Sequence, residues 1–195
     1  LKEIKIYSVP DNYTTIVGDF KASVKVASGK VYEETIEVIK KYNGEPIFRP
    51  KFTPGEEPRA AELINELHIR SKNSPPYMNG TQVEDIIIEP GQKFYVVEYL
   101  NKQDAPGGFG SNKPIATIEE LRQELAVLED WKNPTTDVIV VREYQALQPI
   151  KTRSGAIGPQ PEISGVNAGQ TYPGGGHQYE FLDNWRTTSH TDYMK

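Results

Sequence analysis

Alternating hydrophobic and polar positions predict β-strands along much of this 195-residue chain. Two of these stretches adjoin at Ser28-Gly29, a pair typical of a hairpin turn, and two others are separated by the turn residues Pro90-Gly91. The strongest strand pattern is the run DVIVVREY. The predicted strands cover residues 2–9, 20–39, 83–88, 93–100, 137–144 and 177–182.

Two other segments have helical spacing. Apolar residues recur every three or four positions between 58 and 70, which predicts an amphipathic helix. A second helix is expected to begin at Thr117, because Thr117 and Glu120 form a capping box, and to continue to Leu128. Residues 151–176 have neither period and are expected to be a long loop. With so few helices to connect parallel strands, we expect an α+β fold with a mostly antiparallel β core and about two helices.

Residues 71–82 are a loop by composition. We expect residues 1–80 to be a strand-rich and helical N-terminal segment, and residues 81–195 to form the domain that carries the chemistry. Because the chain begins with Leu1, we also expect it to be a fragment or a processed product.

Composition excludes several classes of function. The net charge is −5, so the chain lacks the basic surplus that phosphate neutralisation in nucleic-acid binding requires. No cysteine is present, which excludes disulfide scaffolds, thiolate zinc sites and cysteine nucleophiles. No apolar run is long enough to span a membrane. The three histidines are not at metal-ligand spacing, so we expect no metal site.

The stretch YPGGGHQYEF at 172–181 carries the main candidate chemistry. Its glycines precede a strand pattern instead of a helix, which argues against a phosphate loop of the nucleotide-binding kinds. Side chains alternate across a strand, so Gln178 and Glu180 share one face. Gln178 offers a donor and an acceptor for a sugar hydroxyl or a carboxamide, and Glu180 offers negative charge to an anomeric carbon. The alternative is an ordinary hairpin with a solvated face and His177 as a packing or solvent residue.

Aromatic residues surround a second glycine-rich segment, GGFGS at 107–111. Phe109 is flanked by glycines that bring no packing area, so its ring is a candidate for stacking on a planar ligand. Tyr95 and Trp131 have core packing as their default interpretation. Arg122, in the second helix, is either part of a solvated face or a phosphate partner.

An ordered set of these features resembles a known toxin family. The set consists of Pro90, Gly91 and Tyr95, then GGFGS, Arg122 with Leu125-Ala126, Trp131, VVREYQALQPI, Gly155 to Pro159, and finally PGGGHQY. It resembles the toxin domains related to the tuberculosis necrotizing toxin, which occur at the C-termini of bacterial polymorphic and contact-dependent toxins and in fungal surface NADases. The resemblance covers about residues 88–182.

The resemblance implies a fold like that of the necrotizing toxin and a metal-free activity that hydrolyses NAD, as substrate, to nicotinamide and ADP-ribose. It implies catalytic roles for Gln178 and Glu180. The substrate-binding residues that it implies are Tyr95, Phe109, Ser111, Arg122, Gly175 and Gly176. This chain has Val96 where the family usually carries an arginine beside the position of Tyr95, and Lys93 or Arg142 is the candidate substitute.

A mono-ADP-ribosyltransferase that uses Gln178-Tyr179-Glu180 as its Gln-x-Glu motif is an alternative, as is a β-rich binding domain without enzymatic activity. As a toxin, the chain would be secreted, would act in the cytoplasm of a target cell, and would have a cognate immunity protein as partner. The first 80 residues would then be a pre-toxin segment or would complete the fold.

Overall fold

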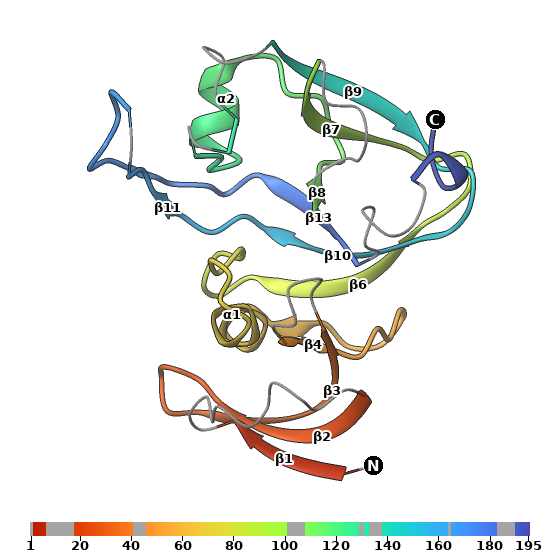
Figure 1. The fold of residues 1–195 in the computed structure, drawn as a ribbon, viewed down its shortest axis with the longest axis vertical. Helices are drawn as coiled ribbons and strands as arrows, with labels where there is room; N and C mark the ends of the chain where they lie inside the picture. Colours follow the sequence, from red (N-terminus) through yellow and green to blue (C-terminus); the bar gives the residue numbers. More distant parts are fainter. Residues whose placement is uncertain are drawn as a thin grey trace.

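The computed structural model describes residues 2–6, 18–40, 46–100, 108–128, 131–132, 138–163, 165–182 and 190–195. In these residues the fold is α+β, with mostly antiparallel sheets and two α-helices, as the sequence predicts (Figure 1). None of the helices found there is long and apolar enough to cross a membrane.

The N-terminal sheet has the order β1-β2-β3-β4. β1 runs parallel to β2, and the other pairs are antiparallel. The predicted hairpin is confirmed, because Gly29 N–H donates to Val26 O at 2.9 Å between β2 and β3. Pro46 and Pro50 are typical of irregular chain, but here they bound β4 at the edge of the sheet, where a missing N–H is tolerated. The bounds are β1 (Lys2–Ile6), β2 (Gly18–Lys25), β3 (Val31–Lys40) and β4 (Pro46–Pro50).

A second sheet has the order β5-β6-β10-β13-β8, and β7 pairs with β9 beside it. The expected loop at 151–176 is wrong, because it contains most of β10, the central strand, and the β11–β12 hairpin. Within the expected loop the pattern does not indicate β10, because the buried residues that follow Ile150 in this strand are the polar Thr152, Arg153 and Ser154. The bounds are β5 (Arg59–Ala60), β6 (Gln82–Ile88), β7 (Lys93–Tyr99), β8 (Phe109–Gly110), β9 (Ile139–Gln145), β10 (Ile150–Ala156), β11 (Gln160–Pro161), β12 (Thr171–Tyr172) and β13 (His177–Phe181).

The helices are α1 (Ala61–Arg70) and α2 (Ile118–Gln123). The predicted N-cap of α2 is confirmed, because Glu120 N–H donates to Thr117 Oγ1 at 3.1 Å. α2 ends at Gln123 and not at Leu128, since the chain turns away through Ala126, whose φ is +49°. A left-handed alanine cannot continue a right-handed helix.

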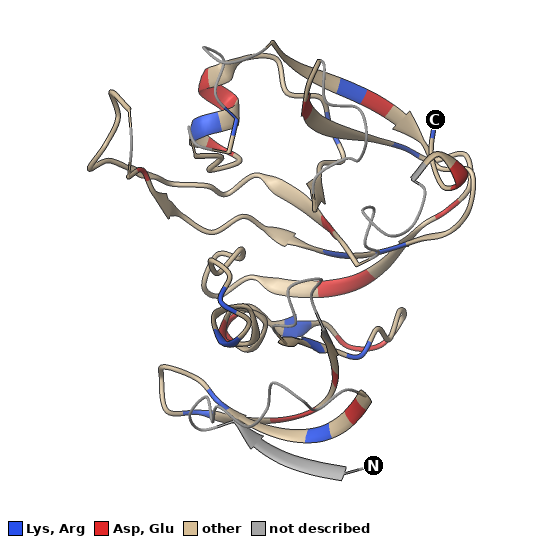
Figure 2. Ribbon diagram, viewed as in Figure 1, with Lys and Arg blue, Asp and Glu red and all other residues tan. Residues whose placement is uncertain are grey.

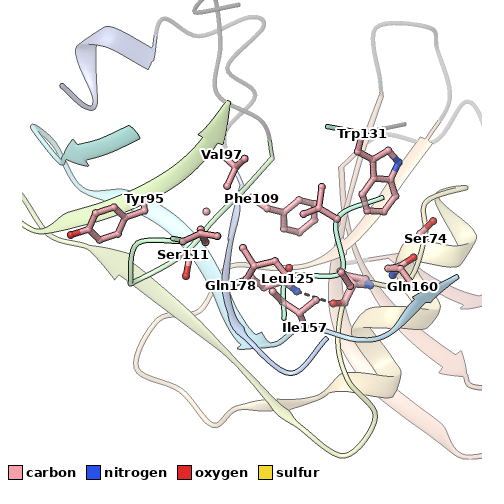
Figure 3. A pocket seen from close by; sticks show the side chains of 15 residues that line it. Ser74, Tyr95, Val97, Phe109, Ser111, Leu125, Trp131, Ile157, Gln160 and Gln178 are labelled. Atoms are coloured by element: carbon pink, nitrogen blue, oxygen red, sulfur yellow. Dashed lines mark hydrogen bonds between the residues drawn. The ribbon is translucent and has the colours of Figure 1, made fainter. Parts of the chain in front are cut away.

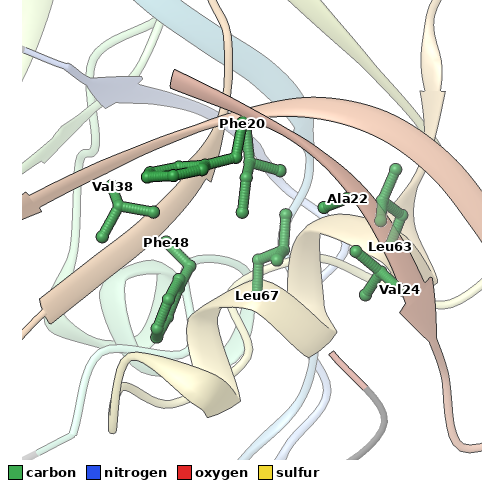
Figure 4. Close-up of a cluster of buried hydrophobic side chains, with 8 residues drawn as sticks. Phe20, Ala22, Val24, Val38, Phe48, Leu63 and Leu67 are labelled. Atoms are coloured by element: carbon green, nitrogen blue, oxygen red, sulfur yellow. The ribbon is translucent and has the colours of Figure 1, made fainter. Parts of the chain in front are cut away.

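α1 lies between the two sheets and packs against both. Leu63 and Leu67 pack with Phe20, Val38 and Phe48 of the N-terminal sheet (Figure 4). On the opposite side of the helix, Ala61 and Ile64 pack against Tyr77 and Val83. Val83 belongs to β6 of the second sheet. The helix therefore joins the regions on either side of residue 80, and the expected domain division there remains a prediction.

A buried carboxylate joins the sheets a second time. Asp85 of β6 accepts from Arg153 Nε at 2.9 Å, from Arg59 Nη1 at 2.8 Å and from Thr53 N–H at 2.8 Å. The second Arg153 nitrogen, Nη2, donates to Pro50 O at the end of β4. In Figure 2 the acidic segment of β6 lies between basic segments on β10 and at β4. Because Arg153 and Asp85 are almost fully buried, each charge depends on the other for stabilisation.

Replacing Asp85 with alanine should lower the free energy of unfolding by about 3–5 kcal/mol, because both arginine charges stay buried without their shared partner. Denaturant unfolding measures this change. Asp19→Ala is the matched control, since Asp19 pairs with Lys51 on the surface and its loss should change stability little. Equal effects of the two substitutions would contradict a central role for Asp85.

Candidate active site

The glycine run before β13 packs against the backbone of neighbouring segments. A Cβ on Gly174, whose φ is +73°, would lie 2.5 Å from Ile157 O, and one on Gly176 would lie 2.9 Å from Glu124 O. Gly175 N–H donates to Ile157 O at 2.8 Å, and Gly176 N–H donates to Glu124 O at 3.0 Å. The space beside the α-carbons of Gly174 and Gly176 is therefore occupied by protein backbone.

Gly175 and Gly176, which the resemblance assigns to substrate binding, line a polar groove with Ser154 and His177. His177 Nδ1 accepts from Asn112 N–H at 3.3 Å, so Nε2 carries the proton of the neutral ring and donates to Ser154 Oγ at 2.6 Å. Burial, with a smaller contribution from Lys113, lowers the pKa of His177. His177 is thus a neutral donor to Ser154 and is not arranged to act as its base.

Gln178 follows on β13 and faces a different cavity. Its side chain is only 6% exposed, and its Nε2 donates to Pro76 O at 2.8 Å, the dashed line in Figure 3. Gln178 lines this cavity, and the loop that follows α1 holds its amide in one orientation.

The cavity beside Gln178 has a volume of about 150 Å³. Apolar cavities of roughly 150 Å³ hold a single six-membered ring. Among the described residues, those that line it carry no charge. They are Ser74, Pro76, Tyr95, Val97, Phe109, Gly110, Ser111, Ile115, Leu125, Ala126, Val127, Trp131, Ile157, Gln160 and Gln178.

The predicted aromatic residues meet at this cavity in different ways. Phe109 is 44% exposed on the edge strand β8, and in Figure 3 it and Trp131 lie above Gln178 and Ile157. Tyr95 also lines the cavity, but its ring points away from the other side chains and its hydroxyl donates to Glu143 at 3.1 Å. The available stacking surfaces are therefore Phe109 and Trp131.

Ser111 is buried at the cavity wall. Its backbone exchanges hydrogen bonds with Tyr95 at 2.8 and 2.9 Å, which joins the edge of β8 to β7. Its hydroxyl accepts a long contact from Lys113 N–H at 3.5 Å. Ser111 thus lies where the sequence places it, with its hydroxyl only weakly engaged.

Glu180 shares the face of Gln178 but does not line the cavity. His68 Nε2 lies 2.5 Å from Glu180 Oε1, and Tyr77 hydroxyl donates to Oε2 at 3.1 Å. Burial alone would raise the pKa of Glu180, but the charge and hydrogen bond of His68, together with Arg153 and Tyr77, lower it to about 2. Glu180 is therefore an ionised, buried group that anchors β13 to α1.

Arg122 differs from the expectation of a phosphate partner. Its guanidinium is buried and donates to the carbonyls of Val127 at 2.8 Å, Leu128 at 3.1 Å and Lys132. These bonds hold the turn that carries Trp131 and three other cavity residues. The sequence pattern does not show that Arg122 is buried. In the structure, Arg122 supports the wall of the cavity.

Neither the residue at the position of the family's strand arginine nor its two candidate substitutes lines the cavity. Val96 is buried in an apolar cluster with Phe94, and its side chain does not line the cavity. Lys93 pairs with Glu143 at 3.0 Å, and Arg142 Nε lies 2.8 Å from Glu98. Neither cation lines the cavity, so in the described residues no substitute for the arginine is found there.

Sequence reasoning missed Gln160, which lines the cavity opposite the expected residues. It lies in the stretch first interpreted as a loop, directly after the Gly155 to Pro159 element. Its Nε2 donates to Pro75 O at 2.9 Å. A polar residue between two prolines, Pro159 and Pro161, was the available signal, since prolines fix the local backbone.

In the part of the chain that the structure describes, no cluster of three or more histidine, aspartate or glutamate side chains could hold a metal ion.

No family model matches this chain, and no curated protein matches it. A chain in the structure of Tne2 in complex with Tni2 aligns with 61% of this chain over 90% of its own length, with 27% identity and a TM-score of 0.45. A chain in the structure of Tse6 in complex with Tsi6 aligns with 53% of this chain over 74% of its own length, with 15% identity and a TM-score of 0.33. Because both TM-scores are low, we base the proposed function on the residues of this cavity.

The anchoring role of Glu180 predicts a pH dependence. Its pKa in the folded state, about 2, lies below the ordinary 4.5, so the ionised carboxylate stabilises the fold above pH 4.5 and this contribution is lost as the pH falls toward 2. Glu180→Gln should therefore be less stable than the wild type at pH 7, and the difference should narrow between pH 4.5 and 2. Thermal unfolding across this range measures it, and a constant difference would refute the anchoring role.

Replacing Arg122 with methionine should lower the free energy of unfolding by about 2–4 kcal/mol, because three buried carbonyls lose their charged donor. The turn that carries Trp131 should also loosen, which tryptophan emission reports in a Trp185→Phe background, where Trp131 is the single tryptophan. The exposed Lys93→Met substitution is the control and should change neither measurement. An unchanged tryptophan spectrum in Arg122→Met would contradict the proposed support of the cavity wall.

Proposed function

We propose that this protein hydrolyses the bond between nicotinamide and ribose in NAD. The observation that carries the proposal is the uncharged, ring-sized cavity with the buried, oriented amide of Gln178 at its wall. The resemblance of PGGGHQY to NAD-hydrolysing toxin domains supports the same reaction. NAD is the substrate, and no cofactor or metal is part of the proposal.

The chemistry of the leaving group suits this cavity. The nicotinamide ring of NAD is a planar cation, and the faces of Phe109 and Trp131 attract such a ring. When the C1′–N bond breaks, its electron pair moves onto the ring nitrogen and the pyridinium becomes neutral nicotinamide. Positive charge then develops on the ribose, as in other glycosyl cleavages. The uncharged cavity solvates a cation less well than water does, so relative to water it favours the neutral product and therefore cleavage.

The remaining steps require water and an oriented ribose. Water attacks C1′ and releases a proton to solvent, which gives ADP-ribose. In the proposal, Gln178 orients the ribose or the attacking water, because its fixed amide has no further motion to lose on binding. Glu180 is a positioning residue that holds β13, and therefore Gln178, against α1.

The geometry favours hydrolysis over the alternative transferase activity. A Gln-x-Glu transferase needs its glutamate at the substrate, but Glu180 is enclosed by His68 and Tyr77 and does not line the cavity. The non-enzymatic alternative does not require a buried amide oriented into an apolar cavity, and such an arrangement is costly unless a ligand uses it.

The biological setting is part of the same proposal. The toxin domains that this chain resembles imply a secreted protein that acts in the cytoplasm of a target cell, together with a cognate immunity protein in the producer. An immunity protein that covers the cavity would block NAD hydrolysis without any chemistry of its own.

The purified chain should release nicotinamide from NAD, and Gln178→Ala should lower kcat/KM roughly 100-fold, since one preorganised polar group of an active site is typically worth this much. Liquid chromatography of nicotinamide and ADP-ribose measures the turnover. Gln123→Ala, an exposed glutamine of α2, is the control and should leave turnover unchanged.

With NAD labelled in its adenylate half, the label should appear as free ADP-ribose. Label on protein would instead show the transferase. Absence of both turnover and NAD binding in calorimetry would favour a binding domain.

A further inference from the structure

Two consecutive carbonyls of the loop after α1 hold two cavity glutamines. Gln160 Nε2 donates to Pro75 O at 2.9 Å, and Gln178 Nε2 donates to Pro76 O at 2.8 Å. Both glutamines are only 6% exposed, and both line the same cavity from different strands, β11 and β13. Two buried amides are thus fixed by one short segment.

The chemistry of a carbonyl decides which way each amide points. A carbonyl oxygen only accepts, so the NH₂ group of each glutamine must face its proline and the amide oxygen must point elsewhere. Neither amide oxygen of Gln160 or Gln178 accepts a hydrogen bond from any residue that the structure describes. Neither oxygen is sealed from solvent, either. The apolar cavity is therefore lined by two glutamines whose amide oxygens are unpaired among the described residues, which suits a ligand that donates hydrogen bonds.

The loop that orients these amides is itself rigid. Asn65 of α1 accepts from Tyr77 N–H at 2.9 Å and donates to Tyr77 O at 2.8 Å, so one side chain fixes the residue after the two prolines. Pro76 O also accepts from Gly158 N–H at 2.9 Å. The prolines restrict the backbone further. The acceptors are therefore in place before a ligand arrives.

We propose that Gln160 determines specificity by accepting a hydrogen bond from the carboxamide NH₂ of nicotinamide. This assignment rests on the proposed function. In Figure 3, Gln160 lies at the end of the cavity where Trp131 and Ser74 are drawn, and Trp131 is a stacking surface for the ring. Gln178 lies nearer Ser111 in the same view, and in this proposal it contacts the ribose. The cavity holds about one ring, so the ring and its carboxamide must meet one of these acceptors.

Two analogues of NAD separate this contact from general binding. The 3-acetylpyridine analogue has a methyl group in place of the NH₂, so it leaves the oxygen of Gln160 without a donor. The thionicotinamide analogue keeps the NH₂ and changes only the carbonyl. The test is the kcat/KM of each analogue relative to NAD, in the wild type and in Gln160→Met, which has similar length but no amide.

In Gln160→Met the preference for NAD over the acetylpyridine analogue should fall about tenfold relative to the wild type, the size of one hydrogen bond to a buried acceptor. The preference for NAD over the thionicotinamide analogue should not change. Differences in leaving-group ability cancel, because each ratio is compared between two proteins. Gln123→Met, on the exposed face of α2, is the matched control and should keep both ratios.

Gln160→Leu serves as the second variant, and circular dichroism verifies that both variants fold. An unchanged acetylpyridine ratio in a folded Gln160 variant would overturn this assignment while leaving NAD hydrolysis intact. A wild-type chain that releases no nicotinamide would overturn the proposed function and this assignment with it. A tenfold fall in the acetylpyridine ratio alone supports the contact, because misplacement of the cavity wall would change both ratios.

Discussion

The carboxylate of Asp85 is the constraint on which the arrangement of this molecule depends. A buried charge costs several kcal/mol unless its partners satisfy it, and here Arg59, Arg153 and the Thr53 N–H do so from different elements. Arg153 also reaches Pro50 O, so the network connects the end of the N-terminal sheet to the centre of the second one. Since each donor is needed by the same carboxylate, the two sheets cannot shift independently, and the position of α1 between them follows from this.

α1 contacts the segments that carry the cavity residues. Its apolar residues Leu67 and Ile64 are buried toward opposite sheets, while its polar residues Asn65 and His68 contact Tyr77 and Glu180. The helix therefore fixes both the loop that orients the cavity amides and the strand that carries Gln178. A segment that only preceded the domain with the cavity would not need these contacts. They favour the interpretation that the residues before position 80 complete the fold.

The sequence predicts the elements whose burial is apolar and fails where burial is polar. Alternation identifies β2, β3, β6 and β7, and helical spacing identifies α1, because apolar residues are buried on one side of each. β9 is identified from its β-branched run instead. β10 is central but lacks an apolar pattern, since the buried residues after Ile150 are a threonine, an arginine and a serine whose partners come from distant segments. The site shows the same division. Gln178 was found from its local pattern, whereas the enclosure of Arg122 and the role of Gln160 depend on contacts that no local pattern contains.

The motif PGGGHQY contains glycines that allow a close approach of backbones and a glutamine, Gln178, that lines the cavity. The glycines permit a crossing of backbones, because Ile157 O and Glu124 O occupy the space that side chains at 174 and 176 would need. This crossing sets the start of β13 and therefore the point at which Gln178 meets Pro76 O. A side chain at Gly174 would displace the amide by shifting the strand, without blocking the cavity. The glycines thus serve the site at a distance, and clearance for a ligand is provided instead by the uncharged wall between Phe109, Trp131 and the two glutamines.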